Sequence, residues 1–482
     1  MSTLFSPQVM IVSVVLAVTG IAALVAITQI TPKLNVLYFV AAIHALANCL
    51  GESADIAAVS STTTTAVKLT RIFSPVLLVV LAVAIYRVRR LGPAGKALMV
   101  FSVLYVSTAI WSPQPFWALV YKGIASCTFL GGLALAYGTR DVSDFIRGLR
   151  IFAVIGGAFG LLGVSYVIQH PEAAFSSRAF AFGMSPPQVG GVSAPILLMC
   201  VCLVFHDRSL RWKAYSMLAA GSLLLLILFA GARGPLGVAV IGSFFLALPL
   251  VKHPVRLLIG GVVLGAFVFT LVQVFHTEAF ERFKDYSPEN RYEIWKWGWN
   301  NFKRSPLVGQ GWLYVSHASA SSSRISRLPT ANAGPCWNES LIGERASRAS
   351  RFTPRGAHNM YIQVLAESGL LGVACFLICG FLVMRRTIAM CSRVRRNPNI
   401  GGCFAFAPAC LLAILAHGLA TAAPLSAETF HTMSIGFCVG LVDQFWKWDA
   451  LDLRGHAVRQ KMAFQQIRTR YRPGSAGPEP AT

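Results

Sequence analysis

The sequence predicts an all-α polytopic membrane protein with about 12–13 transmembrane helices. Three observations support this fold class. Of the 482 residues, 55% are hydrophobic and only 13% are charged, and the mean hydropathy is +0.60. The apolar residues gather in runs of roughly 17–25, the length that crosses the hydrocarbon core of a bilayer. A soluble fold could not hide that much apolar surface, which excludes the ordinary soluble classes.

The apolar runs divide the chain into four parts. Residues 1–275 hold the N-terminal transmembrane helices, and 276–360 form one long outer loop with short helices. Residues 361–446 hold the C-terminal helices, and 447–482 form a basic cytoplasmic tail whose end we expect to be disordered. The first apolar run lacks a preceding basic region and an Ala-x-Ala site, so we expect a retained helix.

The individual spans follow from hydropathy alone. The threonine-rich stretch 51–71 is either a loop or a partly inserted helix, which leaves the helix count open by one or two. The expected spans are 8–30, 34–50, 72–88, 97–112, 116–137, 150–168, 190–206, 214–231, 235–251, 256–275, 361–384, 402–421 and 425–446.

The formal net charge of +23 would suggest a nucleic-acid partner in a soluble protein. Here the basic residues cluster in short stretches between apolar runs, which is the pattern of loops that stay in the cytoplasm. We therefore expect membrane lipids as partners and no nucleic acid. Placing every basic cluster inside puts the C-terminus in the cytoplasm and leaves four outward segments: 51–71, 169–189, 232–234 and 276–360.

Neither a metal site nor a disulfide framework is expected. The eleven cysteines show no CxxC spacing, and only Cys336 lies in the long polar segment. The outer segments also contain no Asp-x-Asp motif for a divalent cation. The sequence thus predicts no cofactor.

Four arginines stand at the outer ends of expected helices: Arg71, Arg178, Arg233 and Arg291. Each could be an interfacial side chain that reaches lipid headgroups. Arg233 fits that reading least, because it lies in a tight outer hairpin (Gly231-Ala232-Arg233-Gly234-Pro235) where the charge bias disfavours arginine. Since arginine matches phosphate oxygens with two parallel donors, the four together suit an anionic headgroup such as a polyprenyl diphosphate.

The long outer segment adds a candidate proton carrier. Residues 290–303 have helical spacing with an apolar, aromatic face, which favours packing onto the bundle over stacking on a sugar. His358 lies where the chain re-enters the membrane, beside the expected arginine cluster. A lone histidine is often structural, but imidazole is the side chain best suited to proton transfer near neutral pH.

The outer segment and the helix after it contain an ordered set of motifs: Arg291, Ile294, Trp295, Pro306, Gly309 and Gly311, then His358-Asn359 and Glu367-x-Gly369. With these motifs the chain resembles the O-antigen ligase and O-antigen polymerase superfamily over roughly residues 175–375. The stretch from Arg178 to Gln188 and the Arg233 turn are also similar. Two positions depart from the family pattern: Gln188 replaces an asparagine and Ala232 replaces a serine.

The resemblance implies a GT-C-like bundle and a metal-independent, inverting glycosyltransferase in the bacterial inner membrane. Its donor would be an undecaprenyl-diphosphate-linked glycan, and its acceptor a hydroxyl of lipid A core or of a growing polysaccharide, at the periplasmic face. The family's catalytic histidine falls on His358. Its arginines fall on Arg233 and Arg291, with Arg71 and Arg178 supporting the diphosphate.

Several alternatives stay open. The same donor chemistry fits a ligase or a repeat-unit polymerase, and a lipid-glycan flippase or exporter and a protein O-glycosyltransferase are further readings. Glu367 could orient His358, or it could only pack or cap its helix. Four more ionisable residues fall within expected helices and receive no role: His44, Lys122, His417 and Glu428. Lys122 and Glu428 could pair with other polar groups of the bundle.

Overall fold

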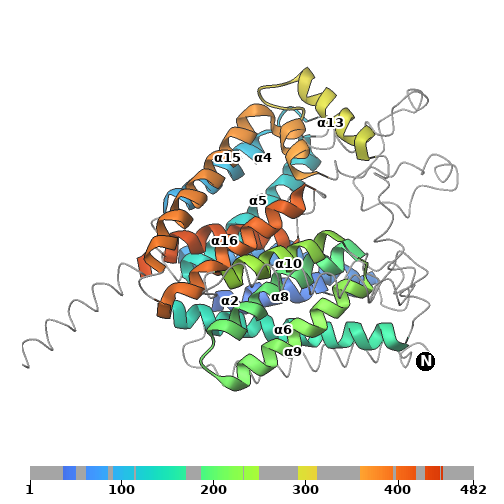
Figure 1. Ribbon diagram of the computed structural model, residues 1–482. Helices are drawn as coiled ribbons and strands as arrows, with labels where there is room; N and C mark the ends of the chain where they lie inside the picture. Colours follow the sequence, from blue (N-terminus) through green and yellow to red (C-terminus); the bar gives the residue numbers. More distant parts are fainter. Residues whose placement is uncertain are drawn as a thin grey trace, which may run out of the picture.

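A computed structural model shows the chain as a bundle of helices (Figure 1). It describes residues 36–49, 61–84, 91–112, 115–169, 186–231, 233–248, 291–311, 359–394, 398–419, 429–445 and 447–448. The expected spans 8–30 and 256–275, most of the outer loop and the basic tail lie outside the described residues. The division into four parts therefore stays a prediction.

Every regular element in the described residues is helical, which confirms the all-α prediction. A further helix covers 430–445. The labelled helices are α2 (Val36–Cys49), α3 (Ser61–Ala84), α4 (Pro93–Ser107), α5 (Pro115–Gly138), α6 (Val142–Gln169), α8 (Pro186–His206), α9 (Leu210–Phe229), α10 (Arg233–Ala247), α13 (Arg291–Arg304), α15 (Met360–Val394) and α16 (Pro398–Gly418).

Five stretches of these helices are long and apolar enough to cross a membrane: Ala118–Gly138, Val142–Gln169, Gln188–His206, Leu210–Phe229 and Met360–Ala389. Shorter apolar helices accompany them, including α2, α4 and the apolar parts of α3, α10 and α16. The described residues thus form a polytopic membrane protein.

Short connections, such as those between α8 and α9 and between α9 and α10, make consecutive helices run in opposite directions. The contacts of Gly234 with His417 and of Asn359 with Leu419 agree with this arrangement. The starts of α8, α10 and α15 therefore lie at the same end of the bundle as the ends of α4, α9 and α16. We call this the distal end. The opposite end carries basic residues of the described part of the chain, such as those at the start of α9, and we call it the basic end.

Two buried carboxylates tie the helices together at the basic end. Asp207, at the turn between α8 and α9, accepts two hydrogen bonds from Arg150 of α6, at 2.7 and 2.8 Å. Asp443 accepts from the Tyr137 hydroxyl at 2.6 Å, from the Gly95 amide at 3.0 Å and from Arg386. Charge-assisted bonds of this kind fix the relative positions of helices from distant parts of the chain.

Glycines let the central helices approach closely. A Cβ on Gly132 of α5 would overlap the Met433 backbone, and one on Gly436 would overlap the Phe129 backbone. Small residues at such a crossing allow two membrane helices to pack backbone against backbone. The helix α5 and the helix at 430–445 thus pack backbone against backbone.

Some predicted boundaries are wrong. Several predicted helices begin too late or end too early, whereas those expected at 97–112 and 214–231 end too late, because α4 ends at Ser107 and α9 at Phe229. The helix expected at 72–88 begins at Ser61, so the threonine-rich stretch is helical from there and Arg71 lies inside α3 rather than at its start. The helix expected at 150–168 begins at Val142, and that expected at 361–384 continues to Val394. Hydropathy marks only the apolar part of a helix, whereas the backbone ladder continues into the polar interface. The predicted helical spacing of 290–303 is confirmed by α13.

Candidate functional site

The turn before α10 places Arg233 at the distal end. Ala230 closes α9, and Gly231 then adopts a φ of 59°, a left-handed conformation that favours glycine. This tight turn lets α10 begin at Arg233. The structure describes the Arg233 backbone; its side chain lies outside the description.

The end of α16 packs directly against the start of α10. A Cβ on Gly234 would overlap the ring of His417, in the last turn of α16. The absence of a side chain at Gly234 therefore allows this contact. As a result, the residue next to Arg233 touches the stretch that ends α16.

The start of α15 meets the same stretch. Asn359 caps α15, since its side-chain oxygen accepts the Tyr361 amide at 3.0 Å and the Ile362 amide at 3.1 Å. Its side-chain nitrogen donates to the Leu419 carbonyl at 3.0 Å, and Met360 packs on Gly418. Asn359 is the residue after His358, which itself lies outside the described residues. The chain neighbours of Arg233 and of His358 thus converge on residues 417–419.

The loop that follows α13 docks on a break in α15. Gly369 interrupts α15 with φ 62° and ψ −162°, a conformation that is essentially restricted to glycine. The break leaves backbone groups without helical partners, and the loop supplies them. The Leu370 amide donates to the Pro306 carbonyl at 2.8 Å, and the Leu371 amide donates to the Leu307 carbonyl at 3.1 Å.

Two loop glycines complete this docking. Gly309 and Gly311 have φ values of 72° and 77°, and a Cβ on Gly309 would overlap the Glu367 backbone. The Gln310 amide donates to the Ala366 carbonyl at 2.8 Å, and the Gly311 amide donates to the Glu367 carbonyl at 3.1 Å. The motif residues Gly309, Gly311 and Gly369 therefore act together. They hold the chain that leaves α13, whose first residue is Arg291, against the first turns of α15 (Figure 1).

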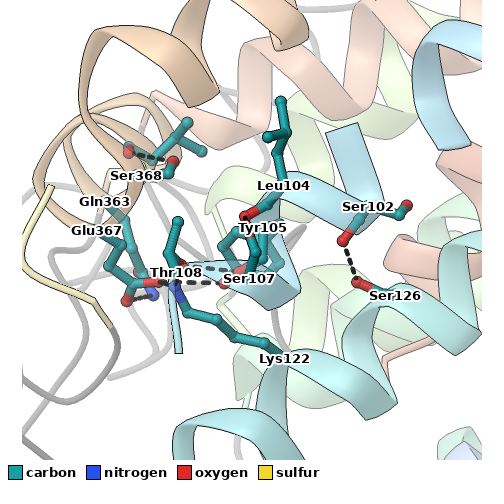
Figure 2. Close-up of polar contacts among 11 residues, drawn as sticks. Ser102, Leu104, Tyr105, Ser107, Thr108, Lys122, Ser126, Gln363, Glu367 and Ser368 are labelled. Carbon is teal, nitrogen blue, oxygen red and sulfur yellow. Dashed lines mark hydrogen bonds and ion pairs between the residues drawn. The ribbon is translucent and has the colours of Figure 1, made fainter. Parts of the chain in front are cut away.

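A buried ion pair lies next to the contact between this loop and α15. Figure 2 shows Glu367 of α15 and Lys122 of α5 pointing toward each other, with 3.6 Å between Lys122 Nζ and Glu367 Oε2. The two residues are 0% and 1% exposed. Lys122 also donates to the Thr108 hydroxyl and lies over the Tyr105 ring, 4.4 Å from its centroid.

Glu367 is held by further donors. The Tyr105 hydroxyl donates to Glu367 Oε2 at 3.2 Å, and the Gln363 amide donates to Oε1 at 3.0 Å. Its carboxylate thus joins α4, α5 and α15. Met360 and Glu367 are separated by about 10 Å along a helix at 1.5 Å per residue. The geometry therefore favours a packing role for Glu367 over the orientation of His358. It also shows that Glu367 is the polar partner of Lys122 in the bundle.

The predicted arginines differ in how they lie. Arg71 is 6% exposed and donates its Nε–H to the Ala47 carbonyl of α2 at 3.0 Å. It belongs to the α2–α3 interface, rather than to a loop in front of a helix. Arg291 opens α13, with its side chain outside the description, and Arg178 lies outside the described residues altogether.

Sequence reasoning missed most of the partners. Tyr105, Thr108 and Gln363 carry no motif that would single them out, and only the fold brings them to Lys122 and Glu367. Within the described residues, no cluster of three or more His, Cys, Asp or Glu side chains could hold a metal ion.

Residues 218–377 match the family model described as O-antigen ligase. This part of the chain is therefore similar to O-antigen ligases. The matched range covers about a third of the chain and includes Arg233, Arg291 and His358, so it supports the superfamily to which the sequence motifs pointed. No curated protein matches the chain.

Proposed function

We propose that this chain is a multi-pass membrane glycosyltransferase of the O-antigen ligase type. It moves a glycan from undecaprenyl diphosphate to an acceptor sugar hydroxyl, on lipid A core or on another polysaccharide, at the periplasmic face of the inner membrane. One observation carries the proposal. The domain match spans the segments with Arg233, Arg291 and His358, and the described neighbours of Arg233 and His358 meet at residues 417–419 of the distal end.

The proposed chemistry is a direct displacement. An acceptor oxygen forms a bond to the anomeric carbon while the bond from that carbon to the diphosphate breaks. Arg233 and Arg291, supported by Arg178, stabilise the charge that develops on the diphosphate, whereas Arg71 is buried between α2 and α3. His358 accepts the proton of the acceptor hydroxyl as general base. Displacement in one step inverts the anomeric configuration, and the arginines take the place of a divalent cation.

A second candidate is a repeat-unit polymerase, which uses the same donor and extends a chain. A deletion strain separates the two through its lipopolysaccharide and exopolysaccharide profile. Full-length chains left on the lipid carrier indicate a ligase, and accumulated single repeats indicate a polymerase. Lipid-linked glycan confined to the cytoplasmic leaflet would contradict both and indicate a flippase.

Complementation ties the phenotype to the site. Wild-type protein should restore the profile, whereas His358→Ala and Arg233→Ala should not. Arg147→Ala serves as the matched control, because Arg147 lies on α6 at the basic end and bonds only to Ser143 in the described contacts. An unaltered profile with His358→Ala would overturn the proposed mechanism.

A further inference from the structure

Two buried histidines face each other at the distal end. His417, in the last turn of α16, and His431, in the helix at 430–445, have ring centroids 5.2 Å apart, with the ring planes tilted by 46°. The side chains belong to residues that are 7% and 0% exposed. Within the part of the chain that the structure describes, Nδ1 of His417 and both ring nitrogens of His431 have no hydrogen-bond partner.

Such an arrangement costs stability. A buried polar atom without a partner has lost its bonds to water and gained none in return. An apolar side chain at either position would avoid that loss. Since three such atoms lie close together, a functional role explains the histidine pair better than packing does.

The pair lies near the starts of three helices, α8, α10 and α15, each of which begins at a predicted site residue or follows a segment that contains one. Gly234 of α10, the residue after Arg233, packs on the His417 ring. A Cβ on Gly191 of α8 would lie 3.2 Å from His431 Nδ1, and α8 follows the segment that contains Arg178. The Asn359 cap, next to His358, bonds to Leu419, two residues after His417.

The chemistry of the pair differs from that of the arginines around it. A neutral imidazole donates from one nitrogen and accepts at the other, which matches a hydroxyl group, itself both donor and acceptor. The diphosphate calls for positive charge, which Arg233 and Arg291 supply in the proposed function. An uncharged, hydrogen-bonding pair beside Arg233 suits instead the part of the donor that carries hydroxyls.

We propose that His417 and His431 bind a hydroxyl group of the sugar that is directly attached to the diphosphate, an inference that rests on the proposed function. The pair thereby sets which donor sugar is accepted. The contact between Gly234 and His417 places this hydroxyl site one residue from the arginine that faces the diphosphate.

The test uses variants that lose hydrogen bonding but keep an aromatic ring. Purified His417→Phe and His431→Phe proteins are added to membranes of the deletion strain, which hold the accumulated lipid-linked glycan. Initial transfer rates are measured against the amount of membrane. We expect the apparent KM for the glycolipid to rise roughly tenfold, the factor that one neutral hydrogen bond represents, with the unfolding temperature unchanged or higher.

A matched control and a milder variant keep the test decisive. His206 also has a buried, unpartnered ring nitrogen, but it ends α8 at the basic end, so His206→Phe should leave the KM unchanged. His431→Gln, which retains hydrogen-bonding groups, should raise the KM less than His431→Phe and covers the case in which the phenylalanine variant does not fold. Wild-type KM in folded His417→Phe and His431→Phe, or an equal rise in His206→Phe, would overturn the inference. Failure of the proposed function reads out separately, because the wild-type protein would then leave the glycolipid unconsumed.

Discussion

Glu367→Gln removes one charge of an ion pair that is fully enclosed by α4, α5 and α15. Lys122 would then keep its charge with only uncharged partners, which are the Thr108 hydroxyl, the face of the Tyr105 ring and the introduced amide oxygen. Removing one partner of a buried pair typically costs about 3–5 kcal/mol, because the other charge is left uncompensated. We place Glu367→Gln at the upper end of that range, since a cation in a membrane interior has few substitutes for its carboxylate.

Removal of the other charge, that of Lys122, should cost less. In Lys122→Met, Glu367 keeps the Tyr105 hydroxyl at 3.2 Å and the Gln363 amide at 3.0 Å, so about 3 kcal/mol is expected. The double variant, Lys122→Met with Glu367→Gln, buries no charge and should lose less than either single variant. The two costs are therefore strongly non-additive, which is the signature of a direct pair.

The assay exploits the buried thiols of the bundle. Free cysteines such as Cys200 and Cys410 are buried, so a thiol-reactive fluorophore reports unfolding of the detergent-solubilised protein. Asp207→Asn is the matched control at the basic end, where the partner Arg150 side chain is 23% exposed and water can replace part of the lost interaction. We expect a smaller destabilisation there. A Glu367→Gln protein that melts with the wild type, or a double variant whose loss equals the sum of the singles, would refute the reasoning.

Four further predictions follow from the same contacts. Gly369→Ala should destabilise the protein by about 1–3 kcal/mol or more, because its backbone conformation is nearly restricted to glycine and a Cβ would strike the Leu307 backbone. Gly380→Ala, in the same helix and with open space around it, is the control and should be neutral or stabilising by up to about 1 kcal/mol. Equal shifts of the unfolding temperature in the two variants would contradict this account. Asn359→Ala should cost about 1 kcal/mol of stability through loss of the cap, and its transfer rate should fall by more than this loss of stability explains. A fall in the transfer rate that only matches the loss of folded protein would speak against a link to His358. Arg233→Lys should keep the charge but lose the two parallel donors, so transfer in complemented membranes should fall about tenfold or more; full activity would argue against phosphate binding there. EDTA should leave the transfer rate of washed membranes unchanged, and restoration by added Mg²⁺ after an EDTA-induced loss would exclude the metal-free mechanism.

Composition and periodicity predicted the fold class well, because a membrane span leaves a long apolar record in the sequence. Helix boundaries were harder to predict. Ser61 to Thr65 are polar or β-branched residues, for which the sequence left a loop and a partly inserted helix both open, and they open α3. Inside a bilayer the backbone must satisfy its own hydrogen bonds, which overrides the weak helix propensity of threonine.

The candidate site was only partly visible in the sequence. The motif glycines could be found because their spacing is characteristic, and the structure gives them a shared task at the break in α15. By contrast, Tyr105 and Gln363 reach Glu367 only through helix packing, and no local pattern marks such a contact. His431 was missed for the same reason: its partner His417 is fourteen positions away in the sequence, and their proximity follows from the meeting of α16 with the helix at 430–445.

A structure of the protein with undecaprenyl diphosphate bound tests the central claim most directly. We expect the diphosphate at the distal end, within hydrogen-bond distance of the Arg233 and Arg291 guanidinium groups at roughly 3 Å, with the His358 ring facing the same space. A diphosphate bound at the basic end, or guanidinium groups of Arg233 and Arg291 that point to opposite sides of the bundle, would contradict the account.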